Sequence, residues 1–295
     1  MSDTLAVLPQ YLLPKLALTR SAGVVASWQG GAVTTALIRR FVARYRVDMS
    51  EAAEPRVEAY ASFNAFFTRA LRAGARPLSG APLLCPVDGA ISQFGRIRGD
   101  AIFQAKGHTY SSTALVGGDA ALARQFDNGS FATLYLSPRD YHRIHMPCAG
   151  TLRRMVHVPG ALFSVNPTTA RGVPGLFARN ERVVCVFDDA QGQPFVLVLV
   201  GATIVGSMAT VWHGVVNPPR PGVLRDWRYD AAPTALPQGA EMGRFVLGST
   251  VVMLFTQAVA ERLAFNPGWA PGGAIRMGQP MGQPMGQPTH PQAAA

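Results

Sequence analysis

The chain has 295 residues, of which 48% are hydrophobic, enough to bury a sizeable core in one large domain or two. Its formal net charge of +10 favours an anionic partner, either nucleic acid or an anionic membrane surface. Only 15% of the residues are charged, and nucleic-acid-binding proteins usually carry denser lysine and arginine, so the membrane is favoured. The three cysteines are widely spaced without a CxxC pair, which predicts neither a disulfide framework nor a zinc site.

Residues 1–76 are predicted to form a helical region that associates with a membrane. Between residues 4 and 47 there is no Asp or Glu, whereas Lys and Arg recur. Apolar side chains repeat every four residues along one helical face, at Val33, Leu37, Phe41 and Tyr45. Arg40 and Arg44 share another face. Such a basic amphipathic helix suits an anionic bilayer surface, and packing on the protein's own core is the alternative.

One uncharged segment, residues 190–219, has to be weighed as a membrane span. A spanning helix needs about 20 apolar residues, and residues 195–212 approach that length. However, residues 196–200 read Val-Leu-Val-Leu-Val, and Gly201 and Gly206 interrupt the rest of the apolar run, so we predict buried strands. No secretory signal is recognisable at the N-terminus. The expected location is therefore peripheral, on the cytoplasmic side of the cell membrane.

The remainder of the chain changes character after Pro77. Short apolar runs alternate with Gly, Pro, Asn and Asp, which is typical of a β-rich domain. We predict an α+β protein in which the helical region is followed by a β-rich catalytic core over residues 77–265. Residues 266–295 form a low-complexity tail in which the tetrapeptide Met-Gly-Gln-Pro occurs three times, at residues 277–288. A four-residue repeat with Gly and Pro cannot bury a core of its own, so this tail is predicted to be disordered.

The dipeptide Gly248-Ser249 lies between two apolar, β-branched runs. The glycine leaves its carbonyl with little steric cover, so the Ser249 hydroxyl could attack it. A plain turn between two strands is the structural alternative. Asp88 and His145 could supply an orienting acid and a base for such a nucleophile, although each residue alone is more often structural. The His142-x-x-His145 pair lacks the Glu of a zinc hydrolase motif, and no metal site is predicted.

From these residues alone, two further interpretations remain open. The first is a serine hydrolase that uses Asp88, His145 and Ser249 on an external substrate. The second is a non-enzymatic basic protein that binds a membrane or nucleic acid, with the same three residues in structural roles. Neither of these two interpretations requires the chain to be cut. The resemblance described next implies a third interpretation, which does require it.

Several segments, in the same order, resemble the phosphatidylserine decarboxylase proenzymes of bacteria. The Leu-Gly-Ser-Thr sequence at 247–250, with its preceding residues, resembles their processing site. Further matches are residues 86–92, 104–108, 137–147, 158–166, 176–182, 200–207 and 276–280. The similarity covers about residues 10–255, and because the segments are independent of one another it is specific. The repeated tail differs from the family's usual tails.

The resemblance implies an enzyme whose pyruvoyl cofactor comes from its own chain. With His145 as base, oriented by Asp88, the Ser249 hydroxyl would attack the Gly248 carbonyl, and elimination would cut the chain between these two residues. The residue left from Ser249 would become a pyruvoyl group, form a Schiff base with the substrate amine and accept electrons as CO₂ leaves.

The resemblance also implies a substrate, further site residues and partners. The substrate is phosphatidylserine, and the product is phosphatidylethanolamine. His142 is expected to donate the proton or to polarise the leaving carboxylate, and Tyr135 and Ser164 are expected to contact the substrate. The partners are an anionic membrane surface and the other chain of the same precursor, since the long and short chains stay associated. A homodimer is left open, and neither nucleic acid nor a metal is expected.

Overall fold

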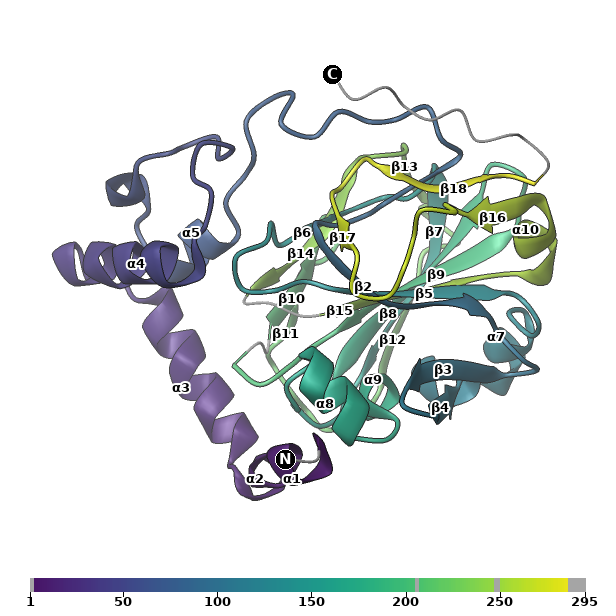
Figure 1. Cartoon of the computed structure of the whole chain (residues 1–295), viewed down its shortest axis with the longest axis horizontal. Helices are drawn as coiled ribbons and strands as arrows, with labels where there is room; N and C mark the ends of the chain where they lie inside the picture. The colour runs from purple at the N-terminus through teal and green to yellow at the C-terminus, as the bar shows by residue number, and fades with distance from the viewer. Residues whose placement is uncertain (1–2, 205–206, 247–249, 286–295) are drawn as a thin grey trace.

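The computed structural model of the chain describes residues 3–204, 207–246 and 250–285. Helices at the N-terminus stand to one side of a β-rich body, with α3 and α4 meeting at an angle (Figure 1). This arrangement confirms the predicted β-rich core preceded by helices. The helical region contains α1 (Asp3–Val7), α2 (Pro9–Leu12), α3 (Lys15–Ser27), α4 (Ala32–Tyr45), the 3₁₀ turn η1 (Val57–Ala59) and α5 (Phe63–Phe67).

Helix α4 packs on the protein through a face that includes only part of the predicted apolar stripe. Its buried residues are Thr34 and Ile38. Phe41 packs edge-to-face on Phe63 of α5, with ring centroids 5.0 Å apart. Val33 and Leu37, by contrast, are 61% and 41% exposed. The helix therefore does pack on the protein's own core, yet it keeps two apolar side chains of the predicted stripe at the surface.

Ser62 precedes a phenylalanine-rich segment, a pattern that predicts a capped helix over residues 62–71, and helix α5 begins there. The Ser62 side chain accepts a hydrogen bond from Ala65 N at 3.2 Å, which satisfies one of the free N–H groups of the first turn. The helix is a single turn and ends at Phe67, earlier than the predicted end near Leu71. Its phenylalanines are buried, and they connect the helical region to the core.

A nine-stranded antiparallel sheet forms the centre of the body. Its order is β12-β7-β8-β9-β15-β5-β2-β17, with β13 also paired to β7. Alternate side chains of β9 and β15 enter two separate hydrophobic clusters, so the sheet is buried on both faces. The strands are β2 (Gly89–Arg96), β5 (Ser130–Tyr135), β7 (Gly150–Val158), β8 (Arg182–Asp189), β9 (Pro194–Val200), β12 (Arg225–Arg228), β13 (Thr234–Leu236), β15 (Thr250–Phe255) and β17 (Ala274–Ile275).

Three smaller sheets and several short helices surround this centre. The four-stranded sheet has the order β11 (Gly214–Asn217), β10 (Ser207–Thr210), β14 (Glu241–Val246) and β6 (Arg143–His145). A three-stranded sheet joins β1 (Leu83–Leu84), β18 (Pro280–Pro284) and β16 (Leu263–Phe265), and β3 (Ala101–Ala105) pairs with β4 (His108–Ser111). The short helices are α6 (Ser112–Leu115), α7 (Ala120–Arg124), α8 (Pro167–Gly172), α9 (Leu176–Arg179) and α10 (Gln257–Arg262).

The uncharged segment forms buried strands, as predicted. β9 occupies an interior position between β8 and β15, and β10 lies between β11 and β14. Over the parts of the chain that the structure describes, no helix combines the length and apolarity needed to cross a membrane.

The prediction that the tail is disordered is wrong for residues 266–285, the part of the tail that the structure describes. Residues 274–275 and 280–284 form β17 and β18, which pair with strands from the body. Met281 is completely buried in the same hydrophobic cluster as Leu83. Within the described residues, Met281 uses a core and β18 uses strand edges supplied by β1 and β16, which composition alone does not reveal.

Candidate active site

The predicted cleavage site lies between two strands of different sheets. β14 ends at Val246, which is paired with Ser207, and β15 begins at Thr250, which is paired with Tyr135 and Val200. Gly248 and Ser249 fall outside the described residues. The Thr250 hydroxyl is buried and has no hydrogen-bond partner among the residues that the structure describes.

Asp88 lies at the turn into β2 and is nearly buried, with 7% of its surface exposed. Its carboxylate accepts hydrogen bonds from Arg76 Nε, at 2.9 and 3.1 Å, and from Met277 N at 2.8 Å. The next residue must be glycine for steric reasons, because a Cβ on Gly89 would lie 2.2 Å from the carbonyl oxygen of Tyr135. Asp88 is thus fixed by Arg76 on one side and by the chain segment after β17 on the other.

His145 ends β6, opposite Glu241 of β14. Its Nδ1 lies 2.8 Å from the carbonyl oxygen of Gly239, and its Nε2 lies 3.0 Å from the Tyr141 hydroxyl. A carbonyl only accepts, so Nδ1 carries the proton and Nε2 is the acceptor. Burial lowers the pKa of His145, and the ring is therefore neutral at pH 7. A neutral imidazole with an unprotonated Nε2 can act as a base.

A backbone hydrogen bond joins the segments that contain Asp88 and His145, but no hydrogen bond between their side chains is present in the described residues. His145 N donates to the carbonyl oxygen of Pro86 at 2.8 Å, two residues before Asp88. In the described part of the chain, the ring of His145 is oriented by Gly239 and Tyr141, whereas Asp88 is bound to Arg76. The Asp88 charge nevertheless acts to raise the pKa of His145, against burial. A direct Asp88–His145 pair would require one of these contacts to exchange.

His142 is completely buried next to the end of β14. Its backbone carbonyl accepts a hydrogen bond from Phe245 N at 3.0 Å, and its ring packs on Phe67 with centroids 4.0 Å apart. Nδ1 lies 2.7 Å from the carbonyl oxygen of Asp140, so this nitrogen carries the proton. Nε2 is buried without a hydrogen-bond partner within the described residues. Burial lowers the pKa of His142 to about 3, so the ring is neutral and Nε2 is an open acceptor.

The loop before His142 is shaped by one carboxylate. Asp140 accepts hydrogen bonds from both the backbone N and the hydroxyl of Ser137, each at 2.7 Å. Burial raises the pKa of Asp140, although these two hydrogen bonds oppose the rise. The closed loop fixes the carbonyl of Asp140, and that carbonyl in turn fixes the tautomer of His142.

The two remaining predicted site residues lie in different surroundings. Tyr135 ends β5 between Ala90 and Thr250, which places it beside the start of β15. Ser164 lies under the N-terminal helices, where its backbone N donates to Gln10 Oε1 at 2.9 Å. The structure thus brings Tyr135 to the strand that follows the predicted cut, and it connects Ser164 to α2.

Comparison with known proteins assigns the family. The model of the family described as phosphatidylserine decarboxylase matches residues 63–283, and a second model described as PSD matches residues 5–46. The chain belongs to the phosphatidylserine decarboxylase family. Proteins named phosphatidylserine decarboxylase proenzyme share 74% identity in Albidiferax ferrireducens and 72% in Azoarcus sp. and Variovorax paradoxus. Each alignment covers 95% of this chain and 96% to 97% of the relative.

Two residues that contact the predicted site residues, Tyr141 and Arg76, were not predicted from the sequence. Tyr141 belongs to the same segment as the two histidines, and its position four residues before His145 could have marked it as a partner. Arg76 gives no such signal, because it lies in the segment between α5 and β1 and meets Asp88 only through the fold. Among the described residues, no three His, Cys, Asp or Glu side chains form a group that could hold a metal ion.

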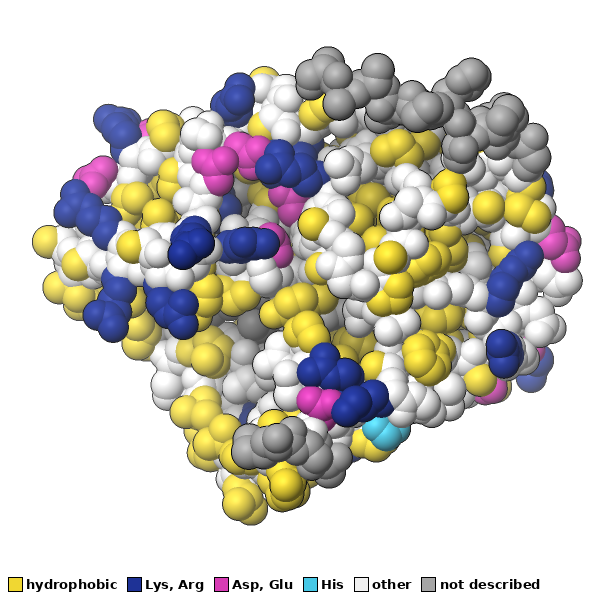
Figure 2. Space-filling view, viewed as in Figure 1, with side chains coloured by type: hydrophobic (Ala, Val, Ile, Leu, Met, Phe, Trp, Pro, Cys, Tyr) yellow, Lys and Arg dark blue, Asp and Glu magenta, His cyan; other side chains and the backbone are white. Residues whose placement is uncertain are grey.

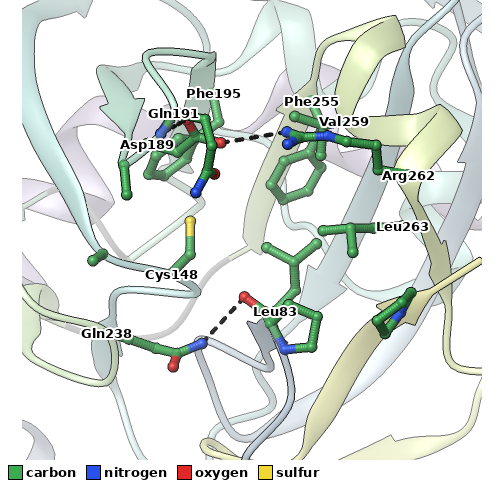
Figure 3. Close-up of a pocket in the computed structure, with 14 residues that line it drawn as sticks. Leu83, Cys148, Asp189, Gln191, Phe195, Gln238, Phe255, Val259, Arg262 and Leu263 are labelled. Carbon is green, nitrogen blue, oxygen red and sulfur yellow. Dashed lines mark hydrogen bonds and ion pairs between the residues drawn. The ribbon is translucent and has the colours of Figure 1, made fainter.

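A separate cavity of about 460 Å³ lies away from these residues (Figure 3). It is bounded by Cys148, Phe255 and α10, and Arg262 approaches Asp189 across it at 3.9 Å. Phe255 ends β15, the strand that Thr250 begins, so the cavity lies at the far end of that strand. Burial raises the pKa of the Cys148 thiol to about 12, so it is not a nucleophilic thiolate at neutral pH.

Proposed function

We propose that the chain is a proenzyme that cuts itself between Gly248 and Ser249 and then converts phosphatidylserine to phosphatidylethanolamine. The names of its close relatives support both the substrate and the proenzyme state. The observation that carries the proposal is a pair of neutral histidines, His142 buried and His145 half-buried, each with Nδ1 held by a backbone carbonyl and Nε2 as acceptor. Both histidines lie in or beside strands that pair with β14, the strand leading to the predicted cut.

His145 would act as the base for self-cleavage. Its Nε2 accepts from the Tyr141 hydroxyl in the uncut chain, and it would take the Ser249 proton after that contact exchanges. Asp88 would contribute through its charge, which favours the imidazolium that forms when His145 takes up a proton. Arg76 would hold the Asp88 carboxylate in place.

The pyruvoyl group that forms from Ser249 would supply an electron sink for loss of CO₂. The residues present fit such a polar group, because Thr250 Oγ1 and His142 Nε2 are buried polar atoms without partners in the described part of the chain. Tyr135 and Ser164 are proposed to contact the substrate, as the sequence predicts.

His142 cannot begin as a proton donor at Nε2, because its proton is on Nδ1. We infer that Nε2 first accepts a proton from the substrate ammonium, which must lose a proton before the nitrogen can act as a nucleophile. The imidazolium is disfavoured by burial, so it would return the proton readily to the substrate carbon that has lost CO₂. His142 would then serve as both acceptor and donor within one turnover.

The N-terminal helices are proposed to bind the cytoplasmic surface of the cell membrane peripherally. Large apolar side chains are exposed there, including Leu12 at 89% and Val24 at 73%. Figure 2 shows hydrophobic side chains gathered over α1 to α3 and Lys and Arg side chains gathered over α4. An apolar surface bordered by cations suits an anionic bilayer. The two cleaved chains would remain associated through β15, and a homodimer remains a prediction.

The intact mass of the purified protein tests the proposal. Wild-type protein should give two chains, residues 1–248 and a shorter one that begins with the pyruvoyl group and resists Edman sequencing. Ser249→Ala should remain one chain of 31.4 kDa, because it lacks the attacking oxygen. Borohydride should abolish decarboxylation by reducing the ketone. An uncut wild-type chain that hydrolyses esters would favour the serine hydrolase instead.

A further inference from the structure

Two cavities adjoin helix α3 and share two arginines. The larger, of about 1130 Å³, lies between α3, the end of β14 and the turn at residues 218–221. The second, of about 840 Å³, lies between the first turns of α3 and residues 159–162. Arg20 of α3 and Arg220 of the turn line both cavities. Both arginines therefore border each cavity, and the larger cavity reaches Val246, the last residue of the strand that leads to the predicted cut.

The two arginines differ in how they are held. Arg20 is exposed and has neither an ion pair nor a hydrogen bond to any residue that the structure describes. Arg220 is largely buried, and its Nε donates to Glu181 Oε2 at 2.8 Å. Glu181 is itself only 2% exposed, and its other oxygen lies 2.9 Å from His157 Nε2. This contact orients the guanidinium of Arg220, while its Nη2 has no hydrogen-bond partner in the described residues.

This distribution of charge favours an anion. Glu181 is the acidic residue at the cavities, and its charge is already paired with Arg220. Arg20 remains an uncompensated cation, and Lys15 adds another at the smaller cavity. A guanidinium that is held in place and retains unused N–H groups is well suited to the tetrahedral oxygens of a phosphate.

The walls of the larger cavity add a second requirement. Val24, Val25 and Trp28 of α3 line one side, and Ile204 and Val246 line the other. A sugar phosphate or a free phosphate would leave these apolar walls in contact with water. A phospholipid satisfies both features, because its phosphodiester carries the charge and its acyl chains begin within a few atoms of it. Val24 and Val25 are also exposed on the outer surface, so the apolar wall continues onto the proposed membrane-binding face.

We propose that Arg20 and Arg220 form a binding site for the phosphodiester of the phospholipid substrate. The acyl chains would lie along Val24, Val25 and Trp28, and the headgroup would point towards the end of β14 at Val246. The identity of the lipid as phosphatidylserine rests on the proposed function, whereas the presence of a phosphodiester site does not.

Binding of a monomeric lipid to the full, processed chain tests this site without a membrane. Dihexanoyl phosphatidylglycerol has the phosphodiester and short acyl chains but no amine that could react. Arg20→Gln should weaken its binding about 10-fold or more in calorimetry, the size expected for losing a charge-assisted hydrogen bond. Arg20 is exposed and has no described partner, so this variant should fold normally, as its melting temperature would confirm.

Arg124→Gln is the matched control, since Arg124 is an exposed arginine of α7 that lines neither cavity. It should bind the lipid as tightly as the wild type. Arg220→Lys keeps a cation against Glu181 but loses the planar fork, and it should also bind more weakly. Equal dissociation constants for Arg20→Gln and Arg124→Gln would overturn the proposal.

Two further measurements distinguish a lipid phosphodiester from free phosphate, and the phosphodiester site from the proposed decarboxylation. Inorganic phosphate should bind far more weakly than the lipid, and equal affinity would indicate a site for free phosphate and overturn the lipid assignment. With dihexanoyl phosphatidylserine, Arg20→Gln should raise KM about 10-fold and leave kcat unchanged. Lipid binding that depends on Arg20 in a chain that never decarboxylates would refute the proposed function and support the phosphodiester site.

Discussion

Arg76 and Asp88 form a buried ion pair in which the guanidinium Nε lies 2.9 Å from Oδ1 and 3.1 Å from Oδ2 of the carboxylate. Their side chains are 5% and 9% exposed. The same guanidinium contacts Glu51, and Glu51 also contacts Arg276 beyond β17. The acid proposed to assist self-cleavage is therefore held by residues from both ends of the chain.

Replacing Arg76 should impair both stability and processing. Arg76→Ala leaves the Asp88 and Glu51 carboxylates without their shared partner, and breaking a buried pair in this way costs about 3–5 kcal/mol. The Asp88 carboxylate should then lose its fixed position and assist His145 less. The test is the free energy of unfolding from denaturant titration, together with the rate at which the 31.4 kDa precursor disappears. Arg76→Lys, which keeps the charge, should process faster than Arg76→Ala, and equal rates would refute a role for Arg76 in holding Asp88.

The two histidines should separate in function. His145→Ala removes the base proposed for self-cleavage and should accumulate as uncut precursor. His142→Ala should still cleave, at least in part, but decarboxylate about 10²-fold to 10⁴-fold more slowly, the usual contribution of general acid–base catalysis. Gel electrophoresis of both variants and CO₂ release from phosphatidylserine provide the comparison. Accumulation of His142→Ala solely as uncut chain would show that this division of roles is incorrect.

Self-cleavage should be insensitive to pH near neutrality. Burial lowers the pKa of His145 from its ordinary value of 6.5, so the ring stays unprotonated to lower pH than a free histidine would. The cleavage rate of newly made precursor should remain level from about pH 8 down to about pH 6.5 and decline only at more acidic pH. A decline with its midpoint above pH 6.5 would contradict His145 as a buried neutral base.

Membrane binding should depend on the basic side chains of α4. Arg39, Arg40 and Arg44 are exposed, and each cation near an anionic surface contributes about 1 kcal/mol, so their joint replacement by Ala should weaken vesicle binding about 100-fold at low salt. Sedimentation with phosphatidylglycerol vesicles measures the change. The control replaces three exposed arginines of the β-rich body, Arg96, Arg98 and Arg124. If both triple variants lose affinity equally, net charge rather than α4 determines binding.

Two methionines of the described part of the tail, one buried and one exposed, allow a test of how much the tail contributes to stability. Met281 is completely buried, whereas Met285, in the next copy of the repeat, is 56% exposed. Met281→Ala should lower the free energy of unfolding by about 2–5 kcal/mol, as for other buried Met→Ala changes, because it leaves a cavity in the core. Met285→Ala should change it by less than about 0.5 kcal/mol. Similar melting temperatures for the two variants would show that β18 contributes little to stability.

The sequence predicts those features that depend on local pattern. Continuous β-branched residues at 196–200 predict a buried strand, and β9 lies in the interior of the nine-stranded sheet. Ser62 before a phenylalanine-rich segment predicts a helix start, and the cap is present. The Ser137 to Pro147 segment contains both histidines, and both proved buried or half-buried beside β14.

Features that depend on residues far apart in the sequence could not be predicted from local pattern. The assistance of His145 by Asp88 remains a prediction, but the sequence does not indicate that Arg76 and Met277 N bind the Asp88 carboxylate or that Gly239 orients the imidazole. Nothing in local spacing indicates which carbonyl or guanidinium the fold will bring to a side chain. The tail was misjudged for the same reason. Met281 reaches a core built by other strands, whereas Met285, in the next copy of the repeat, is exposed, and the repeat itself does not distinguish them.

The position of β15 bears on how the cut protein would hold together. This strand pairs along its full length with β9 on one side and β5 on the other, and it begins directly after the predicted cut. After cleavage, the middle of the main sheet would belong to a separate polypeptide, and the folded protein would be a heterodimer of its own fragments. Its unfolding would then be a dissociation, so its melting temperature would rise with protein concentration, whereas that of uncut Ser249→Ala would not. Maturation would thus convert a fold that can re-form within one chain into one that has to find its partner.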